Sequence, residues 1–414
     1  MSGFDFKDIL QPGDVVAWPQ GPGEPTGLSG ALISQRHDVP AFSLLLGLGA
    51  SRTVRPEHAD KITLRALNGA GNNRSWTHLA EIVPVHISQT PGLIRSHALR
   101  VDVVLLRIRP HTTPGYFTTG VISDFTQALV ETARVVVAEL DERLPLTAND
   151  ALIPAEAIDH IVPAFGADIL MPDPALTEVD QAIAQHVVGI IPNGATIQLG
   201  VGSLPAAVAA ALNNHRDIGV HSGVVTDVLV DLIEAGVVTN ARKGIDSDVT
   251  VTGGLFGTER LRAFASDNSK IVMRASTYTH NQDTLGRLHA LHAINSAIEV
   301  DTTGQVNSEI AGGRYLGAVG GQLDFVRGAQ RSAGGRSIIA LPSTTADGKH
   351  SRIVASLDGR PVTCPRSDAD LVVTEFGIAD LRGCGLQERT RRLVAVAHPN
   401  FRRALVPPLM QAAK

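Results

Sequence analysis

Aromatic residues are scarce in this sequence, at 4% of its 414 residues, while glycine is abundant, with 40 residues. Together with the many alanines and valines, this composition is typical of closely packed layers of helices and strands rather than of a β-sandwich. The chain is longer than the roughly 250–300 residues at which single cores stop growing. We therefore expect two domains, with cores drawn from the 43% of residues that are hydrophobic.

Cysteine is almost absent, and long hydrophobic runs are missing. The two cysteines, Cys364 and Cys384, fit neither a metal-binding pattern nor a disulfide framework, so no metal is expected and a reducing compartment is indicated. No stretch approaches the roughly 18 apolar residues of a membrane span, and the first residues, MSGFDFKDIL, show no basic segment followed by an apolar run. These features predict a soluble, cytoplasmic protein.

An excess of positive charge is also missing. The formal net charge is −5 and the sequence pI is about 6.3, which argues against a nucleic acid or an anionic membrane as partner. The one dense basic cluster, formed by Arg389, Arg391 and Arg392, is expected on a solvated helix face.

Strand and helix patterns alternate along the whole chain, as in layered α/β proteins. Residues 163–180 hold three prolines and no periodic pattern, so we place a linker there, between an N-terminal α/β domain at 1–175 and a C-terminal one at 180–414. The proline- and glycine-rich segment 21–30 is expected to be a loop, and residues 375–380 a turn. Expected strands include 42–48, 62–66, 101–106, 134–138, 195–199, 218–221, 249–252, 293–300, 337–341 and 371–374; expected helices include 125–132, 181–190, 203–212, 227–235, 258–264 and 386–395.

The stretch 194–227 carries the clearest chemical signal. Its strand ends at a glycine turn, Gly200-Val201-Gly202, and Ser203 with Pro205 is expected to begin an alanine-rich helix as its N-cap and first-turn proline. Bare backbone at a helix N-terminus offers free N–H groups to an anion or to a polarised carbonyl. The same pattern also occurs as a plain tight turn in α/β sheets, so the spacing alone leaves both interpretations open.

The C-terminal half is similar to the acetyl-CoA hydrolase/transferase family, which includes 4-hydroxybutyrate and succinyl-CoA:acetate CoA-transferases. From about residue 190 to 402, in the order of the family, it contains the segments IQLGVGSLPAAV, LVDLIEAGVVTN, AINSAIEVDTTGQVNSE, VGGQLDFVRGA, SIIALPSTT, DLVVTEFGIADLRG and AHPNFR. GDVVAWPQGPGEP and PGYFTTGVISDFTQA extend a looser resemblance through the N-terminal half.

The resemblance implies two open α/β domains of the CoA-transferase type, with the site in the cleft between them, in a homodimer. It implies acyl-CoA and a small carboxylate as substrates, with coenzyme A as a substrate and no permanently bound cofactor. In such enzymes a glutamate attacks the thioester, and backbone N–H groups stabilise the oxyanion.

Residue by residue, the resemblance implies CoA-binding positions in two glycine-rich segments and an altered nucleophile position. The family motif H-[ST]-E-x-x-x-D-G is matched by His221-Ser222-Gly223-Val224-Val225-Thr226-Asp227-Val228, which places Gly223 where the family has glutamate. A family lysine that contacts CoA is matched by Ala346, with Lys349 nearby. The CoA-binding positions are Gly200, Val201, Gly202, Ser203, Leu204, Gly320 and Gly321.

Three residues are candidates for the missing catalytic role. Glu299 either places a carboxylate in the cleft or holds the turn that follows it. His221 and Asp227 either orient a water for direct hydrolysis or satisfy a strand end and a helix start. Glu375 is expected at a strand junction, and Asn295 either contacts the ligand or satisfies a turn. The sequence thus predicts CoA transfer, with thioester hydrolysis or a catalytically inactive CoA-binding or partner protein as alternatives.

Overall fold

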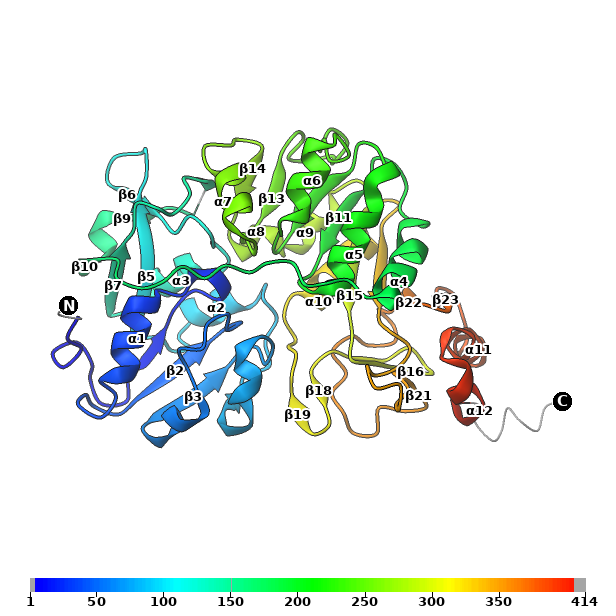
Figure 1. The fold of residues 1–414 in the computed structure, drawn as a ribbon, viewed down its shortest axis with the longest axis horizontal. Coiled ribbons are helices and arrows are strands. Elements are labelled where there is room, and N and C mark those ends of the chain that lie inside the picture. Colours follow the sequence, from blue (N-terminus) through cyan, green and yellow to red (C-terminus); the bar gives the residue numbers. More distant parts are fainter. Residues whose placement is uncertain (1–3, 150, 406–414) are drawn as a thin grey trace.

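The computed structural model describes residues 4–149 and 151–405, which form two α/β halves, each built on a mostly parallel sheet (Figure 1). A segment without helix or strand, residues 164–177, crosses from the first half to the second. The domain limits at 1–175 and 180–414 stay predictions, and their outer ends, residues 1–3 and 406–414, lie outside the described residues.

The first sheet has the order β10-β7-β5-β1-β2-β3-β4, and its strands along this path pair in parallel. The strands are β1 (Val15–Ala17), β2 (Phe42–Leu46), β3 (Ile62–Ala66), β4 (Glu81–Ile82), β5 (Val103–Pro110), β7 (Val135–Leu140) and β10 (His160–Pro163), with β6 (Tyr116–Thr118) and β9 (Ile153–Pro154) attached in antiparallel pairing. The helices are α1 (Thr26–Ser34), α2 (Thr90–Arg95) and α3 (Thr126–Thr132).

The second sheet has the order β23-β22-β20-β15-β11-β12-β13-β14-β8, so one short strand from the first half of the chain, β8, completes its edge. The strands are β8 (Ala148–Asn149), β11 (Thr196–Leu199), β12 (Gly219–Ser222), β13 (Thr250–Thr252), β14 (Ile271–Met273), β15 (Leu291–Ser296), β20 (Arg336–Ala340), β22 (Leu371–Thr374) and β23 (Gly377–Asp380). The helices are α4 (Glu178–Val188), α5 (Ser203–Ala211), α6 (Val228–Glu234), α7 (Glu259–Ala265), α8 (Ser276–Thr279), α9 (Gln282–Gly286), α10 (Gln322–Arg331), α11 (Leu386–Val396) and α12 (Arg402–Leu405).

Two small sheets extend this half (Figure 1). They consist of β16 (Glu299–Asp301), β17 (Val306–Asn307) and β21 (Ile353–Val354), and of β18 (Ile310–Ala311) and β19 (Arg314–Tyr315). The predicted strand 293–300 is therefore wrong as one element, because β15 ends at Ser296 and the chain then pairs with β17 in a separate sheet.

Two further local predictions are corrected by tertiary contacts. Residues 26–30, the second half of the predicted loop, form the start of α1, and residues 377–380 form the edge strand β23 rather than a turn. The hairpin between β22 and β23 turns at Glu375 and Phe376, and Gly377, with a φ of 130°, begins the returning strand.

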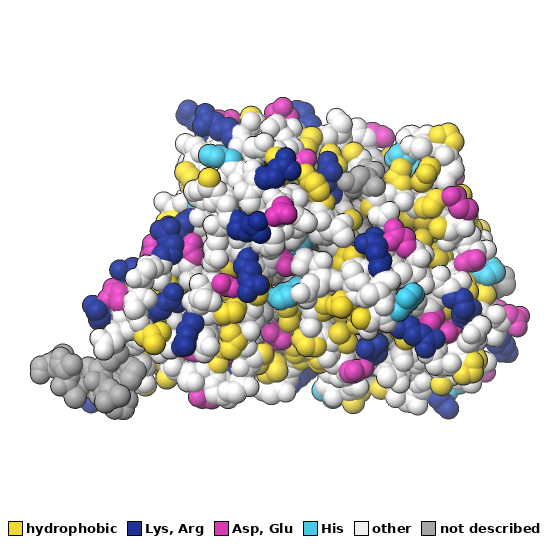
Figure 2. Space-filling model, turned by 180° about the vertical axis from the view of Figure 1, so that it is seen from behind, with side chains coloured by type: hydrophobic (Ala, Val, Ile, Leu, Met, Phe, Trp, Pro, Cys, Tyr) yellow, Lys and Arg dark blue, Asp and Glu magenta, His cyan; other side chains and the backbone are white. Residues whose placement is uncertain are grey.

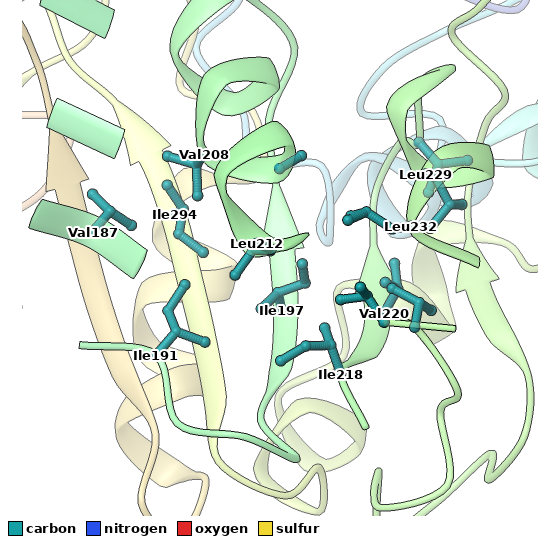
Figure 3. Packing of buried hydrophobic residues seen from close by; sticks show 14 of the residues in the cluster. Val187, Ile191, Ile197, Val208, Leu212, Ile218, Val220, Leu229, Leu232 and Ile294 are labelled. Carbon is teal, nitrogen blue, oxygen red and sulfur yellow. The ribbon is translucent and has the colours of Figure 1, made fainter. Parts of the chain in front are cut away.

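Buried aliphatic side chains explain why the parallel strands form. In β5 the run Val103–Ile108 is buried on both faces, which is the pattern of a strand covered by helices on each side. In the second half, side chains of β11, β12 and β15 meet α5 and α6, as Figure 3 shows for Ile197, Val220, Ile294, Val208 and Leu229. Each such side chain contributes about 1.5–3 kcal/mol when fully buried.

The crossing segment is held by a buried ion cluster between the two halves. Asp168 pairs with Arg107 of β5, and Arg107 also pairs with Asp141. Arg262 of α7 lies 3.8 Å from the Asp168 carboxylate and donates to the carbonyl of Ile169 at 2.6 Å. These contacts hold the linker against both halves of the chain and so hold the two halves next to each other.

The surface carries charges of both signs. Over the face shown in Figure 2, basic and acidic side chains lie interspersed, in keeping with the net charge of −5. In the part of the chain that the structure describes, no helix combines the length and the hydrophobicity that a membrane span requires.

Candidate functional site

A cleft lies where the carboxyl ends of strands from both sheets meet. Its lining includes residues that follow strands of the first sheet, namely Gln20, Leu48 and Asn68, and residues at the ends of strands of the second, namely Gly200, Gly223 and Asn295. Open parallel sheets bind ligands outside the carboxyl ends of their strands, so two such edges share this site. With its open mouth, the cleft holds about 1260 Å³ of free space.

The glycine loop after β11 forms one wall of this cleft. Gly200, Val201 and Gly202 line it, and Gly202 has a φ of 130°, which a residue with a side chain rarely adopts. Gly202, and not Ser203 as predicted, is the N-cap of α5, and no side chain caps this helix. Ser203 is the first helical residue, and Leu204 is buried in the core. The uncapped N–H groups of α5 therefore begin at the cleft.

The second glycine segment forms the opposite part of the lining. Gly320 has a φ of 55° and accepts a hydrogen bond from the N–H of Ile87 at 3.0 Å, which ties it to the first half of the chain. Gly321 is the N-cap of α10, again without a side-chain cap, and both glycines line the cleft. Two helix N-termini thus begin at one cleft, where their partial positive charge favours an anion or a developing oxyanion.

Gly223 lies directly after β12 and faces the imidazole of His280. A Cβ at Gly223 would lie 3.0 Å from His280 Cε1 and 3.1 Å from Nε2, and a Cβ at Gly321 would lie 2.5 Å from the same Nε2. His280 thus occupies the space between the two glycines. All three residues line the cleft.

The imidazole of His280 is held by its neighbours. Its Nδ1 lies 2.8 Å from Thr279 Oγ1, and its ring lies 4.7 Å from the ring of Phe325. Burial lowers the pKa of His280 to about 3, so the side chain is neutral at physiological pH.

Asp124 is the one carboxylate among the described residues that line the cleft. One oxygen accepts from Gln20 Nε2 at 3.0 Å, and the other accepts from the backbone N–H groups of Phe125 and Thr126 at the start of α3. Burial raises the pKa of Asp124 to about 6. Arg74 places an exposed guanidinium group on the lining as well.

Comparison with known proteins identifies the chain. Residues 5–165 match the acetyl-CoA hydrolase/transferase N-terminal domain, and residues 257–408 match the C-terminal domain of the same family. The 4-hydroxybutyrate coenzyme A transferase of Clostridium kluyveri is 35% identical over 94% of this chain and 92% of its own length. The chain belongs to the acetyl-CoA hydrolase/transferase family.

Two further comparisons agree with this membership. The butyryl-CoA:acetate CoA-transferase of Anaerostipes caccae is 34% identical over 84% of this chain and 81% of its own. The crystal structure of RipA from Yersinia pestis superposes with a TM-score of 0.89 and 31% identity, covering 96% of this chain and 93% of that one. The two-domain α/β fold expected from the resemblance is therefore the fold of this family member.

The three predicted catalytic candidates lie outside the described lining of the cleft. Glu299 pairs with Arg360 at 2.9 Å and accepts from Asn307 in the small sheet. Asp227 accepts from the backbone N–H groups of Thr258 and Leu261, so its carboxylate stabilises the start of α7. Both carboxylates have structural partners that account for them.

His221 is fully buried beneath the cleft. Its Nε2 lies 3.1 Å from the carbonyl of Thr279, and burial lowers its pKa to about 3. It supports the segment that carries His280 rather than reaching the cleft itself.

The remaining predicted positions divide between the cleft and the loops. Asn295 lines the cleft and donates to Gln198 Oε1 at 3.1 Å. Glu375 accepts from the N–H of Ser343 at 2.9 Å at the junction of two strands, as expected. Ala346 and Lys349 lie in the loop after β20, and Lys349 is exposed.

Sequence reasoning missed His280, Asp124 and Gln20. His280 lies in the turn between the short helices α8 and α9, in the segment STYTHNQD, whose spacing carries no periodic signal. Asp124 follows a loop of the N-terminal half, and Gly253 of the second half links it to Gly223. The N–H of Asp124 donates to the Gly253 carbonyl, and the N–H of Gly253 donates to the Gly223 carbonyl. Local sequence patterns do not predict this contact, because it joins residues of the two halves that lie far apart in the sequence.

Proposed function

We propose that this protein binds an acyl-CoA thioester in the cleft and hydrolyses it to the free acid and coenzyme A. One observation carries the proposal: the glycines at 200, 202, 223, 320 and 321 line a single cleft, with two helix N-termini beginning there and no side chain at 223. Bare backbone N–H groups suit a thioester carbonyl whose oxygen becomes negative during attack.

Hydrolysis fits the residue at 223. The resemblance places the nucleophilic glutamate of the transferases at this position, and Gly223 has no atom that attacks a thioester. Water is then the nucleophile that remains. Membership of a family whose description names both hydrolase and transferase activity supports either outcome.

CoA transfer with a relocated nucleophile is the second candidate, and Asp124 favours it. A carboxylate in the lining offers the atom that transfer requires, through an aspartyl-CoA thioester in place of a glutamyl one. Against this, both oxygens of Asp124 already accept hydrogen bonds, and one of them stabilises the start of α3. We therefore place hydrolysis first.

Replacing Gly200 tests the placement of coenzyme A. A Cβ at Gly200 would have Pro205 Cγ as its nearest neighbour, at 3.8 Å, so Gly200→Val adds bulk to the cleft with little strain in the loop. Gly202→Val is a poorer test, because the φ of 130° would distort the backbone. We expect Gly200→Val to weaken CoA binding by at least about tenfold, or roughly 1.4 kcal/mol, in calorimetry.

The matched control is Gly385→Val, since Gly385 is exposed, has an extended backbone and would have nothing within 4 Å of an added Cβ. This variant should bind CoA as the wild type does. Unchanged affinity in a folded Gly200→Val variant would show that coenzyme A does not bind at the glycine loop.

A further inference from the structure

We infer that His280 is the catalytic base of this protein and holds the attacking water in the space beside Gly223; this inference rests on the proposed hydrolysis. At position 321 only glycine fits without displacing the imidazole of His280, because an added Cβ would lie 2.5 Å from Nε2. At 223 the corresponding distance is 3.1 Å. The imidazole therefore packs against the bare backbone of both glycines, and it lines the cleft as well as a second depression.

A second, polar depression reaches His280. It is lined by Ser88, Ser276, Thr277, Asn281, Gln282 and Asp283 in addition to the histidine. Within the described residues, Ser276 Oγ and Gln282 Oε1 are buried atoms without a hydrogen-bond partner, and Ser276 is fully buried. Buried hydroxyl and amide oxygens of this kind bind water. Water therefore has a polar approach to the imidazole that is separate from the glycine loop.

The hydrogen bonds around His280 suit a base. A base at Nε2 requires the tautomer in which Nδ1–H donates to Thr279 Oγ1, 2.8 Å away, while the hydroxyl donates to the carbonyl of Ala275 at 3.4 Å. In this tautomer Nε2 carries the lone pair. Nε2 removes a proton from water while the water oxygen bonds to the thioester carbon. The C–S bond then breaks, and the imidazolium returns the proton to the sulfur, giving coenzyme A and the free acid.

The environment of His280 also determines how much the imidazole contributes to the rate of hydrolysis. Because burial keeps the pKa of the imidazole near 3, the neutral form that accepts a proton is fully populated, but it is a weak base. General-base catalysis contributes roughly 10²–10⁴-fold, and a base this far below the working pH belongs at the lower end. We therefore expect His280→Gln to lower the rate of hydrolysis roughly 10²-fold.

The experiment measures thiol release from butyryl-CoA together with CoA affinity by calorimetry. His280→Gln should lose hydrolysis and keep CoA binding within about threefold, since the substitution removes no group from the two glycine loops. His58→Gln is the matched control, because His58 is also buried and accepts a hydrogen bond from the N–H of Arg55 in the first half of the chain. It should hydrolyse as the wild type does.

Rescue separates a chemical role from a structural one. In His280→Ala, added imidazole should restore part of the hydrolysis, because the shortened side chain leaves room that opens to the cleft. Hydrolysis at the wild-type rate in His280→Gln would overturn the role of His280 but not the proposed function. The same conclusion would follow if imidazole did not rescue a His280→Ala variant that folds and binds CoA. Absence of thiol release from the wild type would instead contradict the proposed function.

Discussion

Gly223 has a backbone that accepts a side chain but little room for one. Its φ lies outside the left-handed region that favours glycine, so any residue can adopt the conformation. The His280 ring, at 3.0–3.1 Å from an added Cβ, would have to shift by a few tenths of an ångström. A carboxylate at this position would then stand beside Nε2 in the cleft.

Gly223→Glu should therefore convert the protein toward transfer. Loss of a covalent nucleophile lowers turnover by roughly 10⁴–10⁶, so even an imperfectly placed carboxylate should raise acetate-dependent transfer at least about tenfold. Borohydride reduction after incubation with acyl-CoA should trap a glutamyl-CoA thioester at position 223, detected by peptide mass. Gly223→Gln is the control of equal size, and it should gain neither transfer nor adduct. Equal transfer by the wild type, with an adduct on Asp124, would show that the nucleophile has moved.

Among the elements, α1 shows what local patterns miss. It begins at Thr26 without a capping side chain and contains Gly27 and Gly30, which disfavour a helix. Its first turn is instead held by β7, because the Glu139 carboxylate accepts from the N–H of Leu28. A Cβ at Gly27 would lie 2.3 Å from Glu139 Oε1, so glycine permits this approach. The helix depends on a residue more than one hundred positions away.

The contact between β7 and α1 predicts a pH dependence of stability. Burial raises the pKa of Glu139 from 4.5 to about 7, so the native state binds a proton that the unfolded chain releases between these values. The stability contributed by the protonated form is complete below pH 4.5 and is lost as pH rises through 7. Glu139→Gln should remove this loss, which amounts to about 3 kcal/mol.

Urea unfolding at pH 5 and pH 8 measures this effect. The free energy of unfolding of Glu139→Gln, taken relative to that of the wild type, should be larger at pH 8 than at pH 5. For Glu142→Gln, at an exposed position, this difference from the wild type should be the same at both pH values. The same pH dependence in Glu139→Gln and the wild type would rule out Glu139 as its source.

Helices and strands with a clear local sequence pattern could be predicted. Those that depend on contacts with residues distant in the sequence could not. The alternating pattern of β3 and the buried apolar run of β22 predicted both strands at their observed bounds, and the alanine-rich stretch predicted α5 within a residue. The glycine turns that line the cleft were visible because glycine itself marks them. His280 and Asp124 were not, since their place in the cleft depends on how α8 and the N-terminal half pack around Gly253.

At the scale of the whole molecule, two parallel sheets turn their carboxyl edges toward one cleft. The ion cluster at Asp168 and the hydrogen bond from Ile87 to Gly320 hold the two halves in this arrangement. Each half contributes to the lining, so neither sheet alone offers the site. The homodimer expected from the resemblance stays a prediction.

The proposed hydrolysis requires that water, and not a carboxylate of the protein, attacks the thioester in this cleft. The most direct measurement incubates the wild type with butyryl-CoA, with and without acetate, and follows both free thiol and acetyl-CoA. Hydrolysis predicts that thiol appears at the same rate in both samples and that no acetyl-CoA forms. Formation of acetyl-CoA in proportion to acetate, with little free thiol, would instead show that a carboxylate of the protein carries the CoA.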